Sequence, residues 1–82
     1  MYYGIRAKSK DILARLVRKA FNSGDLYAPV EMKKRYSDWS ENDTFVCLQY
    51  LEGKGLIQLN AADDFYLITL TADAVDYVEP KP

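Results

Sequence analysis

The sequence predicts a small α+β domain in which a helical N-terminal part is followed by a β-hairpin and a short final helix. Apolar residues recur at helical spacing through residues 9–21 and again through residues 41–53. Residues 56–70 change to a pattern rich in β-forming residues with a polar turn in the middle. A chain of 82 residues has room for one domain, which we place over residues 1–82 with its core over residues 9–79.

The composition is that of a folded protein rather than of a disordered or membrane-spanning one. The hydrophobic fraction of 49% and the charged fraction of 28% are close to globular averages. No apolar run approaches the length of a membrane span, and the first residues lack the apolar stretch of a signal peptide. Cys47 is the only cysteine, which agrees with a reducing compartment. We therefore expect a cytoplasmic protein.

The first helix is expected over residues 9–21. Its inward stripe consists of Ile12, Leu13, Leu16, Val17, Ala20 and Phe21. Ser9 is a suitable N-cap, because its hydroxyl can accept a hydrogen bond from a backbone amide of the first turn. Gly24 is expected to end the helix, since glycine readily adopts the left-handed conformation.

The segment after this helix is expected to contain a short extended stretch and a second helix. Residues 26–28 form the extended stretch. The helix is placed over residues 29–36, because Pro29 suits a first helical turn, where no backbone donor is needed. Val30 would point inward from this helix.

The third helix is expected over residues 41–53. Ser40 and Asp43 resemble a capping box, with aspartate in place of the usual glutamate. Helical spacing places on one inward face Thr44, Cys47, Leu48 and Leu51. Gly53 and Gly55 are expected to end the helix.

The last third of the chain predicts a hairpin followed by a helix. Residues 56–59 and 65–70 form its two strands, and residues 60–64 form the turn between them. Thr71 is placed as the cap of the final helix, which covers residues 72–78.

Two helices joined by a short turn and followed by a hairpin make a helix-turn-helix with a wing. Residues 51–57 (LEGKGLI) resemble the end of the recognition helix in winged helix-turn-helix proteins, where two apolar residues lead into the wing. Residues 66–71 (YLITLT) resemble the return strand of the wing, where Leu-Thr starts a C-terminal helix. The chain thus resembles the winged helix-turn-helix superfamily, whose fold has a three-helix core, a C-terminal hairpin wing and here a short final helix.

The resemblance implies a DNA-binding regulator of transcription. It would bind through the helix at residues 41–53, often as a homodimer, with its wing touching the DNA backbone or minor groove. This chain departs from that pattern, because the third helix has no basic residue before Lys54 and the wing tip has none at all. Acidic residues stand in both places: Glu41, Asp43, Glu52, Asp63 and Asp64. Such groups oppose the approach of phosphates.

The charges divide sharply along the chain. Residues 1–36 hold nine Lys/Arg and three Asp/Glu, whereas residues 37–82 hold two and nine. The basic half could face a polyanion, or the two halves could neutralise each other across the fold. If the first interpretation holds, the phosphate-contacting residues are Lys33, Lys34, Arg35, Arg15, Arg18 and Lys19.

Other surface residues are candidates for reading DNA bases or for contacting proteins. Asn42 and Gln49 lie on the third helix and could reach base edges. Exposed aromatic and apolar residues favour interfaces, and the candidates are Tyr2, Tyr3, Phe45, Val46 and Tyr77. Small size and the terminal tyrosines lead us to expect a homodimer.

The residues for catalysis are missing. The chain has no histidine, and Cys47 falls on an inward stripe with no group to activate it. It also has no glycine-rich phosphate loop. We therefore expect neither an enzyme nor a cofactor or metal site. Two hypotheses remain, which are a double-stranded DNA-binding protein and a winged-helix module that binds a protein partner instead.

Overall fold

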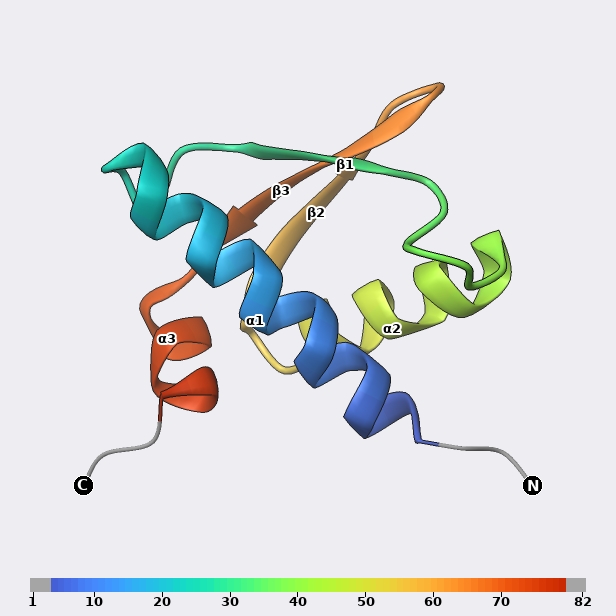
Figure 1. Cartoon of the computed structure of the whole chain (residues 1–82), viewed down its shortest axis with the longest axis horizontal. Coiled ribbons are helices and arrows are strands. Elements are labelled where there is room, and N and C mark those ends of the chain that lie inside the picture. The colour runs from blue at the N-terminus through green and yellow to red at the C-terminus, as the bar shows by residue number, and fades with distance from the viewer. Residues whose placement is uncertain (1–3, 80–82) are drawn as a thin grey trace.

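The computed structural model describes residues 4–79 and has an α+β fold. Within these residues, three helices accompany one three-stranded antiparallel sheet. Their order is α1 (Ile5–Ser23), β1 (Val30–Lys33), α2 (Glu41–Gly53), β2 (Ile57–Ala61), β3 (Phe65–Leu70) and α3 (Ala72–Val78). Helix α1 crosses in front of the sheet, and α2 and α3 lie on either side of it below the hairpin (Figure 1). No helix of the described part is long and apolar enough to cross a membrane.

Helix α1 is longer than the sequence predicted. It begins at Ile5 rather than after Ser9, so the assignment of Ser9 as the cap was wrong. Ser9 lies inside α1, and its buried hydroxyl donates a hydrogen bond to the carbonyl oxygen of Cys47 on α2 at 3.4 Å. The extra turn is held by tertiary contacts, because Ile5 packs against the core and Lys8 forms an ion pair with α2. The predicted end at Gly24 is confirmed by its left-handed φ of 81°.

The expected helix over residues 29–36 was wrong, because this segment contains strand β1. Val30 and Met32 are partly buried and alternate with exposed Glu31 and Lys33, which is the period of a strand. Pro29 precedes the first strand residue and is as compatible with a strand start as with a helix start. Pairing with β3 outweighs the helical tendency.

The expected extended stretch at residues 26–28 was also wrong, because a turn occupies this position. The carboxylate of Asp25 accepts a hydrogen bond from the backbone amide of Tyr27 at 3.0 Å. Between α1 and α2 the structure has strand β1, turns and loops, and no helix. The strand order and the hairpin are compatible with a winged-helix-like layout, but the short helix expected before α2 is replaced by β1 and a loop.

Helix α2 matches the prediction at both ends. The Ser40 hydroxyl accepts a hydrogen bond from the backbone amide of Asp43 at 3.1 Å, which confirms the cap. The predicted inward residues Thr44, Cys47, Leu48 and Leu51 are all buried.

The sheet is covered on one side only. Its order is β1-β3-β2, and the register places Val30 opposite Ile68 and Leu59 opposite the same residue on the other side. The face that contains Ile68 packs against the helices, whereas Leu67 and Glu31 on the opposite face are exposed. The expected common core is confirmed, since one buried cluster includes Leu16, Val17, Cys47, Leu48, Leu51, Ile57 and Ile68.

The hairpin and the final helix also follow the sequence closely. Strand β3 and helix α3 have the expected bounds, whereas β2 is shifted toward the turn by one to two residues. Thr71 stands at the N-cap position of α3, but its hydroxyl makes no capping bond. It donates instead to the carbonyl oxygen of Gly55 at 2.8 Å, and so ties α3 to the end of α2.

Candidate nucleic-acid interface

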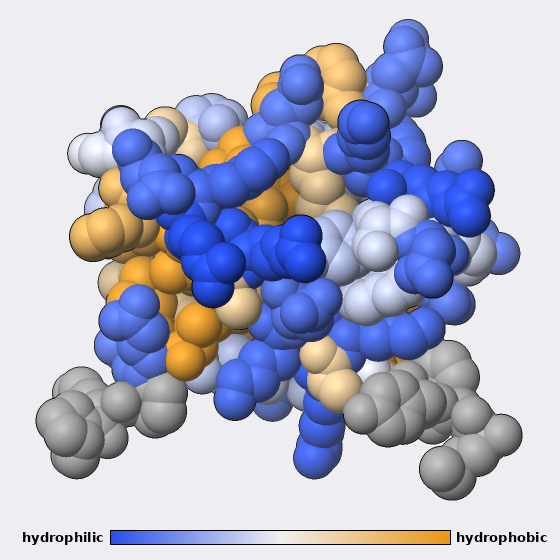
Figure 2. All heavy atoms as spheres, in the orientation of Figure 1, coloured by the Kyte–Doolittle hydropathy of each residue, from blue (hydrophilic) through white to orange (hydrophobic). Residues whose placement is uncertain are grey.

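A groove between α1 and the edge strand β1 collects basic side chains. This α1–β1 groove is a hollow of about 380 Å³. Its four cations are Arg15 and Lys19 from α1, Lys33 from β1, and Arg35 from the loop that follows. One carboxylate, Glu31, also lines it. Figure 2 shows hydrophobic surface between α1 and β1, bordered by the most hydrophilic surface of this face.

The floor of the groove is apolar. It is formed by Ile12, Leu16, Met32 and Phe65, contributed by α1, β1 and β3. Ile12 and Leu16 belong to the buried core, so the floor is anchored by the packing of the whole domain. The cations therefore stand at the rim of a fixed recess.

The four rim cations are not neutralised by the chain's own carboxylates. Within residues 4–79, the one ion pair joins Lys8 to Asp43, with 3.2 Å between Nζ and Oδ2. Arg15, Lys19, Lys33 and Arg35 have no carboxylate oxygen within 4 Å among the described residues. Like charges kept together without partners gain by binding an anion that screens their repulsion.

Both arginines of the groove, Arg15 and Arg35, are held in place by neutral groups. The Nε of Arg35 donates a hydrogen bond to the carbonyl oxygen of Trp39 at 2.8 Å. The guanidinium of Arg15 lies 5.8 Å from the centre of the Tyr36 ring, within the range of a cation–π contact. Each interaction fixes a side chain without removing its charge. The terminal nitrogens of Arg35 form no hydrogen bond with the described residues and keep the fork geometry that suits phosphate.

The loop that closes the groove is tied to both helices. The backbone amide of Tyr36 donates to the hydroxyl of Thr44 on α2 at 3.1 Å, and the Tyr36 hydroxyl donates to Asp11 on α1 at 3.2 Å. Burial, reinforced by the nearby Asp11 carboxylate, raises the pKa of Tyr36, so the phenol stays protonated as a donor. Ser37 lines the groove with a positive φ of 55°, the only non-glycine residue of the described part with this conformation.

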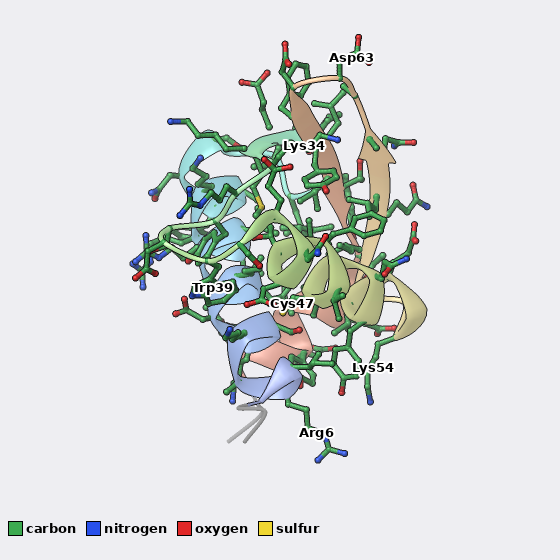
Figure 3. All side chains as sticks on the ribbon, turned by 90° about the vertical axis from the view of Figure 1, so that its right-hand side faces the viewer. Arg6, Lys34, Trp39, Cys47, Lys54 and Asp63 are labelled. Atoms are coloured by element: carbon green, nitrogen blue, oxygen red, sulfur yellow. The ribbon has the colours of Figure 1, made fainter. Side chains whose placement is uncertain are left out.

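The groove does not include two of the six predicted phosphate contacts. Lys34 points to the opposite side, where its Nζ lies 4.4 Å from the centre of the Tyr66 ring (Figure 3). Arg18 lines a separate hollow between α1 and α3. Side chains alternate between two sides along β1 and the two residues after it, so Lys34 lies on the side opposite to Lys33 and Arg35. The helix that the sequence predicted over residues 29–36 could not show this division.

The exposed face of α2 has a different character. Asn42 and Gln49, the predicted base-reading residues, are both exposed there, together with Phe45 and Val46. Helix α2 contains no lysine or arginine. Its carboxylate Glu52 accepts a hydrogen bond from the backbone amide of Leu59 at 3.1 Å, and so braces the edge strand β2. The acidic hairpin tip at Asp63 lies at the outer end of the molecule (Figure 3).

The terminal interface candidates have different outcomes. Tyr2 and Tyr3 lie outside the described residues. Tyr77 on α3 is partly buried and packs against the core, so it is less available for an interface than the sequence suggested. Trp39 packs against the core and contacts the Tyr36 ring with 4.8 Å between centroids.

Some groove residues were missed by sequence reasoning. Tyr36, Glu31 and Ser37 were given no functional role. Only the alternation of Val30, Glu31, Met32 and Lys33 could have placed them, by predicting an edge strand. Over residues 4–79, no group of three His, Cys, Asp or Glu side chains could hold a metal ion.

Comparison with known proteins identifies no relative. No protein-family model, no curated protein and no solved structure matches the chain. The site must therefore be interpreted from its own geometry and charge.

Proposed function

We propose that this domain is a winged-helix-like module that binds DNA through the phosphate backbone in the α1–β1 groove. The single observation that carries the proposal is the placement of Arg15, Lys19, Lys33 and Arg35 around one recess without ion-pair partners among the described residues. Contacts between such groups and phosphates release counterions from DNA, which is the main source of sequence-independent affinity. The module would serve as a small transcriptional regulator.

The proposal moves the DNA contact away from α2. The acidic groups of α2 and of the hairpin tip oppose a phosphate chain, whereas the α1–β1 groove offers positive charge. The side chain of Tyr36 and the apolar floor can contact the sugars of a bound strand. The geometry of the groove therefore supports recognition of DNA by charge and shape more than by base sequence.

The test is a titration of a labelled mixed-sequence duplex by fluorescence anisotropy at about 50 mM salt. Non-specific affinities of DNA-binding proteins run at roughly 10⁻⁴–10⁻⁶ M at physiological salt and tighten below it. We expect binding in that range, and weaker binding by Lys33→Glu than by Lys34→Glu. A polyglutamate chain should compete poorly if phosphates are recognised. No binding by tens of micromolar protein would contradict the proposal.

The exposed face of α2 favours a second candidate, a module that binds a protein partner. Phe45 and Val46 are each 38% exposed on a helix without basic residues. Exposed apolar side chains on a helix that has carboxylates but no cations suit a protein interface better than a phosphate chain. Val46→Asp should abolish partner binding under this candidate and leave DNA binding by the groove intact.

If α2 enters the major groove of DNA instead, Gln49→Ala should alter the preference between DNA sequences.

A further inference from the structure

A second hollow, on the other flank of α1, lies beside the most exposed large hydrophobic side chain of the described residues. This α1–α3 hollow has a volume of about 190 Å³ and apolar walls formed by Ala14, Val17 and Val78. Phe21 stands at its edge and is 83% exposed, so its expected place on the inward stripe of α1 was wrong. Figure 2 shows hydrophobic surface that continues over α1 and α3 on this side. An aromatic side chain beside an apolar hollow is a feature of interaction surfaces.

The rim of the same hollow has one charge of each sign. Arg18 lies on α1, and Glu79 follows the end of α3. They do not form an ion pair with each other, since none but the Lys8–Asp43 pair occurs within residues 4–79. A surface with a knob, a hollow and both charges is complementary to itself, whereas a uniformly acidic or basic partner would match only one of the two charges.

We propose that the α1–α3 hollow is the contact between two copies of this chain, related by a two-fold axis. Phe21 of each copy enters the hollow of the other, and Arg18 of each copy pairs with Glu79 of the other. A two-fold contact repeats every interaction twice, which makes a small patch effective.

This dimer leaves the α1–β1 groove open. Successive residues of a helix are rotated by about 100°, from 3.6 residues per turn. Arg15 and Lys19 therefore project from the flank of α1 opposite to Ala14 and Phe21. The proposal does not depend on DNA binding, and its test needs no DNA.

The first test is the mass of the protein, measured by sedimentation equilibrium from low to high micromolar concentration. The wild-type chain should associate to a dimer. Phe21→Glu should weaken the dimer by about thirtyfold or more, the effect of removing a central aromatic anchor. The matched control is Tyr27→Glu, because Tyr27 is an aromatic residue 58% exposed in the turn after α1 and outside the hollow. A wild-type monomer at every concentration would overturn the proposal, as would equal effects of the two variants.

The second test uses exchanged charges. Arg18→Glu gives a chain with two acidic rim residues, and Glu79→Arg gives a chain with two basic ones, so each variant alone should dimerise several-fold more weakly. A mixture of the two variants should form a heterodimer, because both pairs are then attractive. A mixture that associates no better than its components would contradict the two-fold pairing, even if each chain is folded by circular dichroism.

Discussion

The Tyr36 hydroxyl donates a hydrogen bond to the Asp11 carboxylate at 3.2 Å, which joins the loop after β1 to α1 across the end of the α1–β1 groove. The bond gives the Asp11 carboxylate a neutral hydrogen-bond donor. Arg15 lies against the same Tyr36 ring. Tyr36 therefore holds the loop against α1 through its hydroxyl and contacts the Arg15 guanidinium through its ring.

Replacing Tyr36 by Phe should destabilise the domain modestly. The variant keeps the ring under Arg15 but removes the hydrogen bond, which at an exposed site contributes about 0.5–1.5 kcal/mol. Urea unfolding, followed by circular dichroism, measures the change. Tyr50→Phe is the control, since Tyr50 lies near Lys54 and its hydroxyl forms no hydrogen bond with the described residues. Equal midpoints for the two variants would show that the bond contributes nothing.

Stability should fall at alkaline pH. Burial raises the pKa of Tyr36, with a further contribution from Asp11, and burial raises that of Tyr66, with a further contribution from Glu41. A raised pKa in the folded state means that the stabilisation is complete below the unfolded value near 10 and is lost as pH rises through the folded value. Urea midpoints should stay level up to about pH 9 and then decline.

The double variant Tyr36→Phe/Tyr66→Phe separates the contribution of these two tyrosines from that of all other groups. The double variant has no phenol at either position, so its midpoint should decline less steeply with pH than that of the wild type. An identical decline would assign the effect to other groups.

The backbone at Ser37 should favour glycine over a branched residue. A non-glycine residue at its φ of 55° costs roughly 1–2 kcal/mol. Ser37→Gly removes this cost, but glycine also increases the conformational entropy of the unfolded chain. The two effects oppose each other, so the free energy of unfolding should stay close to that of the wild type. Ser37→Val should destabilise the protein clearly, because its branched side chain fits this conformation poorly. If thermal unfolding shows the valine variant to be as stable as the glycine variant, the loop does not have this conformation in solution.

Leu51 tests the core. It is fully buried on α2 and belongs to the cluster that joins the helices to the sheet. Leu51→Ala should reduce the free energy of unfolding by about 2–5 kcal/mol, because it leaves a cavity. The exposed Leu67, changed to Ala, is the matched control and should have a small effect. A melting temperature of Leu51→Ala close to that of the wild type would contradict the packing.

The sequence predicted the elements whose patterns are locally unambiguous. The stripe of Thr44, Cys47, Leu48 and Leu51 fits only a helix, and the serine cap and the glycines fix its ends. Residues 29–36 are too short for periodicity to decide, and β1 forms because β3 is available as a partner far along the chain. The phosphate candidates were assigned from charge alone. Their division between the groove and other surfaces depends on this strand, for which the four-residue alternation of residues 30–33 is the one local signal.

The most direct test of DNA binding in the groove is the salt dependence of affinity for one duplex, compared among three proteins. Lys33→Ala removes a groove cation, whereas Arg6→Ala removes an exposed cation at the start of α1, outside the groove (Figure 3). For each phosphate that a variant no longer neutralises, the slope of log K against log salt should fall in magnitude by about 0.9. We predict this fall for Lys33→Ala and the wild-type slope for Arg6→Ala. Binding whose slope is unchanged by Lys33→Ala, or reduced equally by both variants, would contradict the account.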